Sequence, residues 1–379
     1  MNGAVYLDHN ATAPVRPEAI KAVTRTLSMV GNPSSVHGFG RAAHRLMDDA
    51  REQVAALAGA APEDVVFTGG GSEANNLAIG GCGRRRIVVS AVEHPSILNA
   101  DAAPEVVPVD GDGVIDLDDL DSRLAREGAP ALVSVMLANN ETGTIQPVAD
   151  VVEAARRHGA LVHCDAAQAP GKMACSFSGL GVDMLTLSAH KMGGPQGIGA
   201  LIVGAAVALK AVTRGGGQER GRRAGTESVP LIAGFGAAAR AVGGGEESQR
   251  LARLRDGLEA RLSRLTPPPV LVGRGAPRLP NTSCIAMPGV ASETQVMALD
   301  LAGVAVSAGA ACSSGKVRPS HVLRAMGLGE SVAGSAIRVS LGWTTTEADV
   351  ERFVAAWAGI DKRLGNGGER RVLVAPAKA

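Results

Sequence analysis

Two kinds of hydrophobic pattern alternate between about residues 63 and 204. Short, almost continuous runs of apolar and β-branched residues cover 64–68, 86–90, 131–137, 160–165, 183–190 and 197–204. Amphipathic stretches such as 72–81 and 148–159 separate them. Continuous apolar runs are typical of strands buried on both faces, and their alternation with helices is typical of a parallel sheet. The pattern therefore predicts an α/β domain.

The pattern changes after a glycine-rich stretch at residues 241–249. A helical period over 248–265 follows it, and a proline cluster comes next. Beyond this cluster, strand-like runs at 281–287, 303–309 and 336–342 are mixed with helical patterns at 293–303 and 347–364. This mixture predicts a smaller α+β domain. We expect a large domain at residues 13–245 and a small domain made of residues 1–12 and 246–379.

Composition and charge narrow the function classes. The chain has 379 residues, 45% of them hydrophobic, which is enough for two buried cores. Lysine and arginine total 38 against 37 aspartate and glutamate residues, so no net field favours nucleic acid or an anionic membrane as a partner. The first residues lack a basic, apolar leader, and no run of about 18 apolar residues follows. We therefore expect a soluble, cytoplasmic protein.

A glycine turn between a strand-like run and a helix offers a site for an anion. Gly69, Gly70 and Gly71 follow the run at 64–68, and Ser72 opens the helical stretch. Backbone amides and the helix N-terminus there can face a phosphate, and the Ser72 hydroxyl can add a donor. The same sequence also fits a plain strand-to-helix turn with Ser72 as its N-cap, so the turn alone leaves both possibilities open.

A carboxylate stands at the end of another strand-like run. Asp165 closes the run at 160–165, and Gln168 lies three residues on. Asp165 could bind a metal, cap a helix or pair with a protonated ring nitrogen. His163 and Cys164 are adjacent, but neighbours on a strand point to opposite faces, so these residues make a poor metal site. The five cysteines include no C-x-x-C pair, and we expect no metal.

Lys191 follows a third strand-like run, beside Ser188 and His190 and before a Gly-Gly-Pro turn. Glycine lets the backbone pass close to a bound ligand. The small and apolar neighbours of Lys191 can lower the pKa of its amine, and a neutral amine can form an imine. The chain has only seven lysines, and we expect no other one in the cluster at the strand ends.

Seven motif blocks in order resemble the cysteine desulfurases of the NifS/IscS type. They are VEHPS (92–96), ANNETG (138–143), HCDAAQ (163–168), SAHKMGGPQGIG (188–199), GGGQERGRRAGT (215–226), SAGAACSSG (307–315) and PSHVLRAMG (319–327). The resemblance runs from YLDHNATAP at residue 6 to WTTTEAD at residue 349, which is nearly the whole chain. It implies the class V aminotransferase family and fold type I of the pyridoxal-phosphate enzymes, with a mainly parallel seven-stranded sheet. It also implies a homodimer that takes sulfur from L-cysteine and passes it to an acceptor protein.

The resemblance further implies which residues hold the cofactor. Lys191 would carry pyridoxal 5'-phosphate as a Schiff base, Asp165 would pair with the protonated pyridine nitrogen, and Gln168 would bond the phenolic oxygen. His94 would stack on the ring and take part in proton transfer. The phosphate would be held by small and polar residues, which are Gly71, Ser72, Ser188, His190 and the partner subunit's Thr226.

The resemblance also implies which residues bind the substrate and accept the sulfur. Asn140 and Arg338 would bind the substrate carboxylate, since arginine offers a bidentate fork. Cys312 would accept the sulfur as a persulfide, and its small, polar, glycine-bearing surroundings are typical of a mobile loop. Asn32 and His37 are expected near the substrate entrance. Structural roles are expected for Cys164, Cys175 and Cys284.

The sequence departs from the family pattern at several positions. Ala308 and Ala310 stand where the family commonly has serines, and Gln218 stands for a histidine. His9 replaces an asparagine, and we expect it at the surface, although it could reach the substrate. A selenocysteine lyase, a cysteine-sulfinate desulfinase or an aminotransferase of the same fold is the main alternative. A sulfur-relay subunit without catalysis is a further one, and the intact Lys191 argues against it. The acceptor could belong to iron–sulfur cluster assembly, to thio-cofactor synthesis or to tRNA thiolation.

Overall fold

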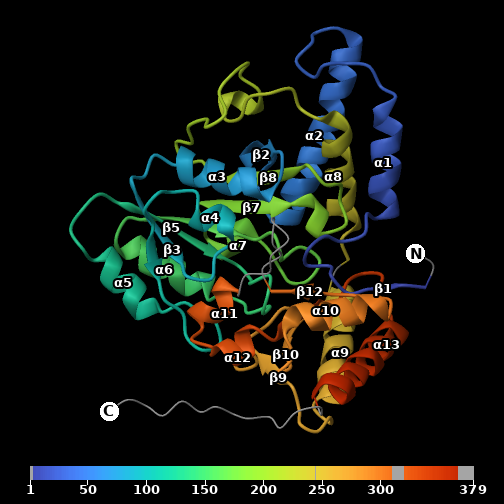
Figure 1. Cartoon of the computed structure of the whole chain (residues 1–379). Helices are drawn as coiled ribbons and strands as arrows, with labels where there is room; N and C mark the ends of the chain where they lie inside the picture. Colours follow the sequence, from blue (N-terminus) through green and yellow to red (C-terminus); the bar gives the residue numbers. More distant parts are fainter. Residues whose placement is uncertain (1–2, 244, 310–319, 366–379) are drawn as a thin grey trace.

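A seven-stranded sheet forms the centre of the larger part of the molecule (Figure 1). The computed structural model describes residues 3–243, 245–309 and 320–365. In sheet order the strands are β2 (Val65–Thr68), β8 (Gly199–Val203), β7 (Met184–Ser188), β6 (Leu161–Asp165), β5 (Ala131–Met136), β3 (Arg86–Ser90) and β4 (Glu105–Val107). Only β8 pairs antiparallel with its neighbours, and the other pairs of this sheet are parallel. The predicted mainly parallel sheet is confirmed.

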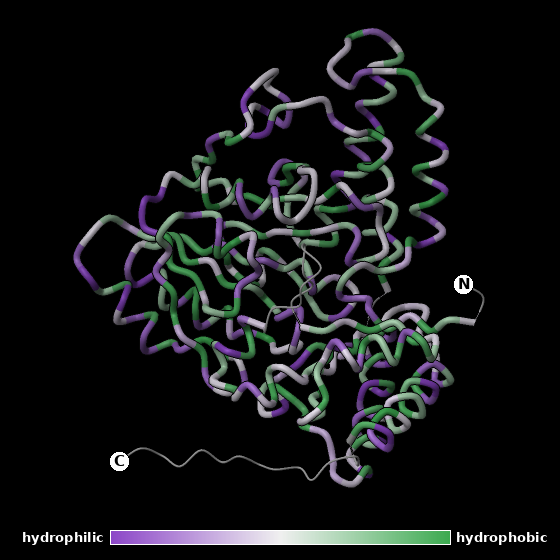
Figure 2. The backbone as a smooth tube through the Cα atoms, viewed as in Figure 1, coloured by the Kyte–Doolittle hydropathy of each residue, from purple (hydrophilic) through white to green (hydrophobic). Residues whose placement is uncertain are grey.

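Helices cover both faces of this sheet because successive strand residues point to opposite sides. On β2, Val65 and Phe67 belong to one core, while Val66 belongs to the core on the other face. Helices that pack on the first face are α1 (Pro17–Leu27), α2 (Gly38–Ala58), α5 (Leu117–Leu124), α6 (Val148–Arg157) and α8 (Val229–Ala241). Helices α3 (Gly71–Gly81) and α4 (Pro95–Leu98) pack on the second. Figure 2 shows the apolar strands inside and the polar positions on the outer helices.

The smaller part is an α+β unit, as predicted. Its antiparallel sheet has the order β12 (Ser307–Ala308), β13 (Ala336–Ser340), β10 (Thr282–Ala286) and β9 (Val270–Val272). Strand β1 (Val5–Tyr6) pairs in parallel with β11 (Val304–Ala305). Helices α9 (Gly245–Leu262), α10 (Ser292–Leu301) and α13 (Glu347–Ile360) enclose a separate apolar core around Phe353 and Trp357. Short helices α11 (His321–Ala325) and α12 (Glu330–Ala333) lie toward the large sheet.

The structure differs from the predicted elements in a few places. The run at 303–309 forms two separate two-residue strands, β11 and β12, because its halves pair with different sheets. Strands β1, β4 and β9 were not predicted, since two or three residues carry no periodicity. Helices α1 and α2 were also missing from the prediction. No helix in the described ranges is long and apolar enough to cross a membrane.

The topology places the loops that carry chemistry at one edge. Strands β2, β3, β5, β6 and β7 run in the same direction, so their carboxyl ends meet there. Gly199 starts the antiparallel strand β8 at this edge, and a Cβ atom on it would lie 2.7 Å from the carbonyl carbon of Gly70. Only glycine therefore lets β8 pass under the glycine turn.

Candidate active site

A cavity of about 350 Å³ lies at the carboxyl ends of the parallel strands. The loops after β2, β3, β5, β6 and β7 supply most of its wall. Asn10 and Ala11 of the N-terminal segment, together with Gly309, His321 and Arg338, complete it from the side of the smaller sheet. The three strand-end clusters expected from the sequence therefore share one pocket.

Asp165 is the last residue of β6 and is almost fully buried. One carboxylate oxygen accepts a hydrogen bond from Asn75 Nδ2 at 2.7 Å, and the other accepts one from the Ala167 amide at 2.9 Å. Asn75 Nδ2 also donates to Ser96 Oγ at 2.9 Å. Asn75 thus joins the carboxylate to the loop that carries His94, and it fixes how Asp165 faces the pocket.

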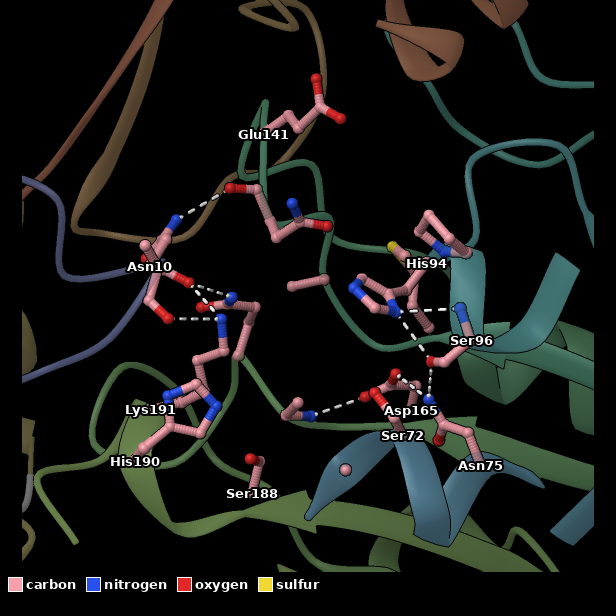
Figure 3. Close-up of a pocket in the computed structure, with 18 of the residues that line it drawn as sticks. Asn10, Ser72, Asn75, His94, Ser96, Glu141, Asp165, Ser188, His190 and Lys191 are labelled. Atoms are coloured by element: carbon pink, nitrogen blue, oxygen red, sulfur yellow. Dashed lines mark hydrogen bonds between the residues drawn. The ribbon is translucent and has the colours of Figure 1, made fainter. Parts of the chain in front are cut away.

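His94 is the N-cap of α4 and lies across the pocket from Lys191 (Figure 3). Its Nδ1 accepts a hydrogen bond from the Ser96 amide at 3.1 Å and lies 2.7 Å from Ser96 Oγ. Because Nδ1 is an acceptor, the neutral ring carries its proton on Nε2. Burial lowers the pKa of His94, so the ring is neutral at pH 7.

Lys191 ends the 3-10 turn η2 (Ala189–Lys191) that follows β7. Its Nζ donates to the carbonyl oxygens of Asn10 and Ala11, at 2.5 and 3.0 Å. Burial, followed by the positive charge of Arg338, lowers the pKa of the Lys191 amine to about 8. The neutral, nucleophilic fraction of this amine near pH 7 is therefore much larger than that of an ordinary lysine.

The far end of the pocket suits an anion. Gly71 and Ser72 form the first turn of the eleven-residue helix α3, where backbone amides lack intrahelical partners. A Cβ atom on Gly71 would lie 3.4 Å from Ser188 Cβ, so the loops after β2 and β7 meet here. His190 Nδ1 is buried and has no hydrogen-bond partner among the described residues. Burial lowers the pKa of His190 to about 4.

A second lysine lies in the strand-end cluster, which contradicts the expectation that Lys191 stands alone. Lys172 is buried, and its Nζ donates to Gln168 Oε1 at 2.6 Å and to Asn10 Oδ1 at 3.0 Å. Gln168 lines the pocket, and its Nε2 donates to the Asn10 carbonyl oxygen at 3.0 Å. The expectation was wrong because Lys172 meets Asn10 across 162 positions of the chain, a contact that no local pattern predicts.

The proposed carboxylate-binding residues also lie in the pocket wall. Arg338 of β13 donates from Nη2 to Asp8 Oδ1 at 2.7 Å and from Nη1 to the Asn140 carbonyl oxygen at 3.1 Å. Its Nε is buried and, within the described part of the chain, has no partner. Burial raises the pKa of neighbouring Glu141, which accepts a hydrogen bond from Ser320 Oγ at 2.6 Å. Arg338 is thus a cation in the pocket wall with a buried donor to spare.

Some expected residues lie elsewhere. Cys312 and Ala310 fall outside the described residues. Thr226 is not part of the pocket wall of its own chain. Asn32 and His37 do not line the pocket either. His37 caps the N-terminus of α2, where its Nδ1 accepts a hydrogen bond from the Gly40 amide.

His9 is buried, so its expected place at the surface was wrong. It packs against Gly342, where a Cβ atom would clash with the imidazole ring, and it lines a narrow cavity behind Lys191. Burial lowers the pKa of His9 to about 4.

The four described cysteines are buried thiols. Burial raises the pKa of Cys82 and Cys164, and it raises the pKa of Cys175 and Cys284 to about 12. A thiol that stays protonated is a poor nucleophile, which agrees with structural roles for these residues.

Several pocket residues were missed by sequence reasoning. Asn75 lies three residues after Ser72, on the same face of a helix, and this spacing could have revealed it. Asn10 and Lys172 gave no local signal, because their partners are distant in the chain. Glu93 precedes His94 and is fully buried, with Oε1 accepting from the Met136 amide at 2.7 Å. Burial raises the pKa of Glu93 well above its usual range.

Comparison with known proteins identifies the family of the chain. The family described as aminotransferase class-V matches residues 5–353. The chain belongs to this family. A cysteine desulfurase from Cereibacter sphaeroides is 46% identical over 376 residues, which cover 95% of this chain and 96% of that protein. The crystal structure of a NifS-like protein from Rickettsia africae is 35% identical, with a TM-score of 0.88, over 95% of this chain and 99% of that one. A structure titled SspA in complex with cysteine is 30% identical, with a TM-score of 0.78, over 89% of this chain and 99% of that one. These matches confirm the predicted family and fold.

Family membership implies the use of pyridoxal phosphate, and the pocket fits this cofactor. The orphaned Nδ1 of His190 and the free amides of α3 suit its phosphate. Asp165, held by Asn75, offers a carboxylate for the pyridine nitrogen, and the amine of Lys191 lies in the same cavity. The donor set therefore matches a molecule with an anionic group, a basic ring nitrogen and a reactive carbonyl.

Proposed function

We propose that this protein is a pyridoxal-phosphate-dependent cysteine desulfurase, which converts L-cysteine to L-alanine and leaves the sulfur as a persulfide on Cys312. The observation that carries the proposal is a pocket that holds a lysine amine and a buried carboxylate and has Gly309 in its wall. Cys312 comes three positions after Gly309 in the sequence, and three such steps of the chain span at most about 11 Å. Relatives named cysteine desulfurase over nearly the full length support the same conclusion.

Each residue of the cofactor pocket has a distinct task in this proposal. Bound there, pyridoxal phosphate supplies an electron sink for the bonds at the substrate Cα. Asp165 keeps the ring nitrogen protonated, and Gln168 donates to the phenolic oxygen. The phosphate would be held by Gly71, Ser72, Ser188 and His190 of the turn and strand ends, joined by the partner subunit's Thr226.

Other residues of the pocket wall bind the substrate and transfer protons in this proposal. Arg338 and Asn140 bind the carboxylate of L-cysteine, because Arg338 has a buried donor that the described residues leave unused. The neutral amine of Lys191 takes the proton from the substrate Cα, which its lowered pKa permits. His94, with its proton on Nε2, would stack against the ring and take part in proton transfer.

The sulfur step belongs to Cys312. Its thiolate attacks the substrate sulfur, the bond between Cβ and sulfur breaks, and a new S–S bond forms on the protein. A proton replaces the sulfur at Cβ, so that L-cysteine and a thiol give L-alanine and a persulfide. A sulfur-acceptor protein, from iron–sulfur cluster assembly, thio-cofactor synthesis or tRNA thiolation, then takes the terminal sulfur.

The proposal includes a cytoplasmic homodimer with one pocket in each subunit. It also includes a large domain at residues 13–245 and a small domain made of residues 1–12 and 246–379. That boundary coincides with Gly245, the first residue of α9. Support for a second copy comes from large apolar side chains that are exposed on α1, the loop after it and the start of α2, namely Ile20, Leu27, Met29, Val30, Val36 and Phe39. Exposed apolar surface of this kind is typical of interfaces.

Incubation with L-cysteine tests the function. The wild-type protein loaded with cofactor should release alanine and carry an extra sulfur atom on Cys312, as mapped by mass spectrometry. Cys312→Ser should keep the visible band of the cofactor and release alanine at least a hundredfold more slowly, because a hydroxyl cannot accept the sulfur. Cys82→Ser is the matched control and should behave as wild type. Alanine release by Cys312→Ser at the rate of wild type would favour a lyase or an aminotransferase of the same fold instead.

A further inference from the structure

Lys172 is a buried lysine that the proposed reaction does not use. Only about 6% of its surface is exposed, and its Nζ donates to two neutral oxygens, Gln168 Oε1 and Asn10 Oδ1. Burying an amine is unfavourable unless its hydrogen-bonding groups are used. Burial of the Lys172 amine therefore has a cost in free energy, and the two oxygens that the amine contacts indicate its role.

The contacts of Lys172 determine how the Gln168 amide is turned. The amine of Lys172 donates to one end of the amide, and the carbonyl oxygen of Asn10 accepts from the other end at 3.0 Å. A flipped amide would place its oxygen against the Asn10 carbonyl oxygen and its NH2 group against the Lys172 amine. The contact between the two oxygens would be unfavourable in either protonation state of Lys172, and the contact with a protonated amine would be unfavourable as well, so the orientation with Oε1 toward Lys172 is preferred.

Gln168 stands between the main pocket and the narrow cavity behind it. Gln168 and Asn10 line the main pocket, whereas Lys172 lines only the second cavity. The oxygen of the amide therefore points away from the main pocket, and its nitrogen lies on the pocket side. One N–H of that nitrogen is used by Asn10, which leaves the other for a ligand.

Lys172 can hold its two acceptors whether or not its amine is protonated. Burial lowers the pKa of the Lys172 amine well below its usual range, and the nearby Lys191 and Arg338 lower it further. His9 of the N-terminal segment and His190 of the turn after β7 also feel the charge of Lys172, which helps to lower the pKa of both rings. In either protonation state the Lys172 amine has two N–H groups for its two acceptors.

We infer that Lys172 is a positioning residue, which holds Gln168 Oε1 so that Gln168 Nε2 stays available as the donor to the phenolic oxygen of pyridoxal phosphate. This inference rests on the proposed function, because it concerns the same cofactor. The inference goes beyond the proposed function because it predicts that Lys172, which does not contact the cofactor, controls how tightly the cofactor is bound.

A double-mutant cycle on cofactor binding tests the inference. The full chain, freed of cofactor, is titrated with pyridoxal phosphate and followed by visible absorbance as wild type, Lys172→Met, Gln168→Leu and the double variant. Lys172→Met should raise the Kd by about tenfold and move the absorbance maximum, since a charged or oriented hydrogen bond is lost. In the Gln168→Leu background, Lys172→Met should add less than twofold, because residues that act through one another are not additive.

Two further variants keep the test decisive. Gln168→Glu preserves the partner of Lys172 and the volume of the site, but it replaces the donor nitrogen by oxygen, so it should also bind about tenfold more weakly. Ser248→Ala is the matched control, because Ser248 Oγ donates to the Lys172 carbonyl oxygen at 2.8 Å and leaves the amine untouched. It should bind as wild type.

Independent, additive effects of Lys172→Met and Gln168→Leu, or a wild-type Kd and spectrum in Lys172→Met, would overturn the inference. Wild-type binding by Gln168→Glu would overturn it as well. These outcomes are separate from failure of the proposed function, in which the wild-type chain itself would not bind the cofactor or would release no alanine from L-cysteine.

Discussion

The depressed pKa of Lys191 gives a quantitative prediction for the attachment of pyridoxal phosphate. Burial and Arg338 bring the pKa of this amine to about 8, from an ordinary value of 10.5. At pH 7 about 9% of such an amine is neutral, compared with about 0.03% at the ordinary value. The reactive fraction is therefore about 300-fold larger in the folded protein.

The rate of attachment to the cofactor-free chain, followed by its visible band, should reflect this difference. It should rise tenfold per pH unit below pH 8 and level off above it, because only the neutral amine attacks the carbonyl. The same titration with a simple alkyl amine corrects for the ionisations of the cofactor itself.

Arg338→Gln extends the test. Loss of the guanidinium removes a charge that disfavours protonated Lys191, and it frees Asp8, whose carboxylate favours the protonated form. Both changes raise the pKa of Lys191, so the midpoint should move to higher pH and the rate at pH 7 should fall. A rate that keeps rising tenfold per unit to pH 10 in the wild type, or a midpoint unchanged in Arg338→Gln, would refute this account.

Three further predictions concern the supports of the pocket. Asp165→Asn should raise the Kd for pyridoxal phosphate by tenfold or more, because the new amide loses the negative charge and sets an NH2 group against Asn75 Nδ2; a titration with unchanged Kd would make Asp165 a mere cap. Glu219→Gln should lower the free energy of unfolding by about 3–5 kcal/mol in a denaturant melt, because it leaves Arg51 buried without its charge partner; a loss below about 1 kcal/mol would contradict this. His163 is buried and its pKa is lowered to about 4, so between pH 6.5 and 4 the unfolded chain binds a proton that the folded chain does not. Stability should therefore be complete above pH 6.5 and fall by up to about 1.4 kcal/mol per unit as the pH drops, and His163→Gln should make this part of the profile flatter.

The sequence predicts those pocket residues that directly follow a strand. Asp165 and Lys191 each follow an apolar run, and parallel strands bring their carboxyl ends to one edge. The glycine turn before Ser72 is found by the same logic. These residues could be placed together before any coordinates because their positions depend on local pattern and on one topological rule.

The supports of these residues could not be predicted in this way. Lys172 and Asn10 meet across 162 positions of the chain, and no periodicity relates them. The division of residues 303–309 between two sheets depends on which strands lie nearby and not on its own apolar content. Burial of His9 depends on the missing side chain of Gly342. Such contacts are properties of tertiary packing, to which local pattern is blind.

The N-terminal segment connects Arg338 and Lys191 through a short stretch of chain. Strand β1 is anchored in parallel on β11, with Val5 paired to Val304. Asp8, three residues on, binds Arg338, and the carbonyl oxygen of Asn10 binds Lys191. Two Cα atoms that are two residues apart can be separated by at most about 7 Å. The distance between Arg338 and Lys191 is thus limited by this segment, although Arg338 lies on the small sheet and Lys191 follows a strand of the large one. A one-residue insertion between positions 8 and 10 would lengthen that span while every strand of both sheets stayed in register.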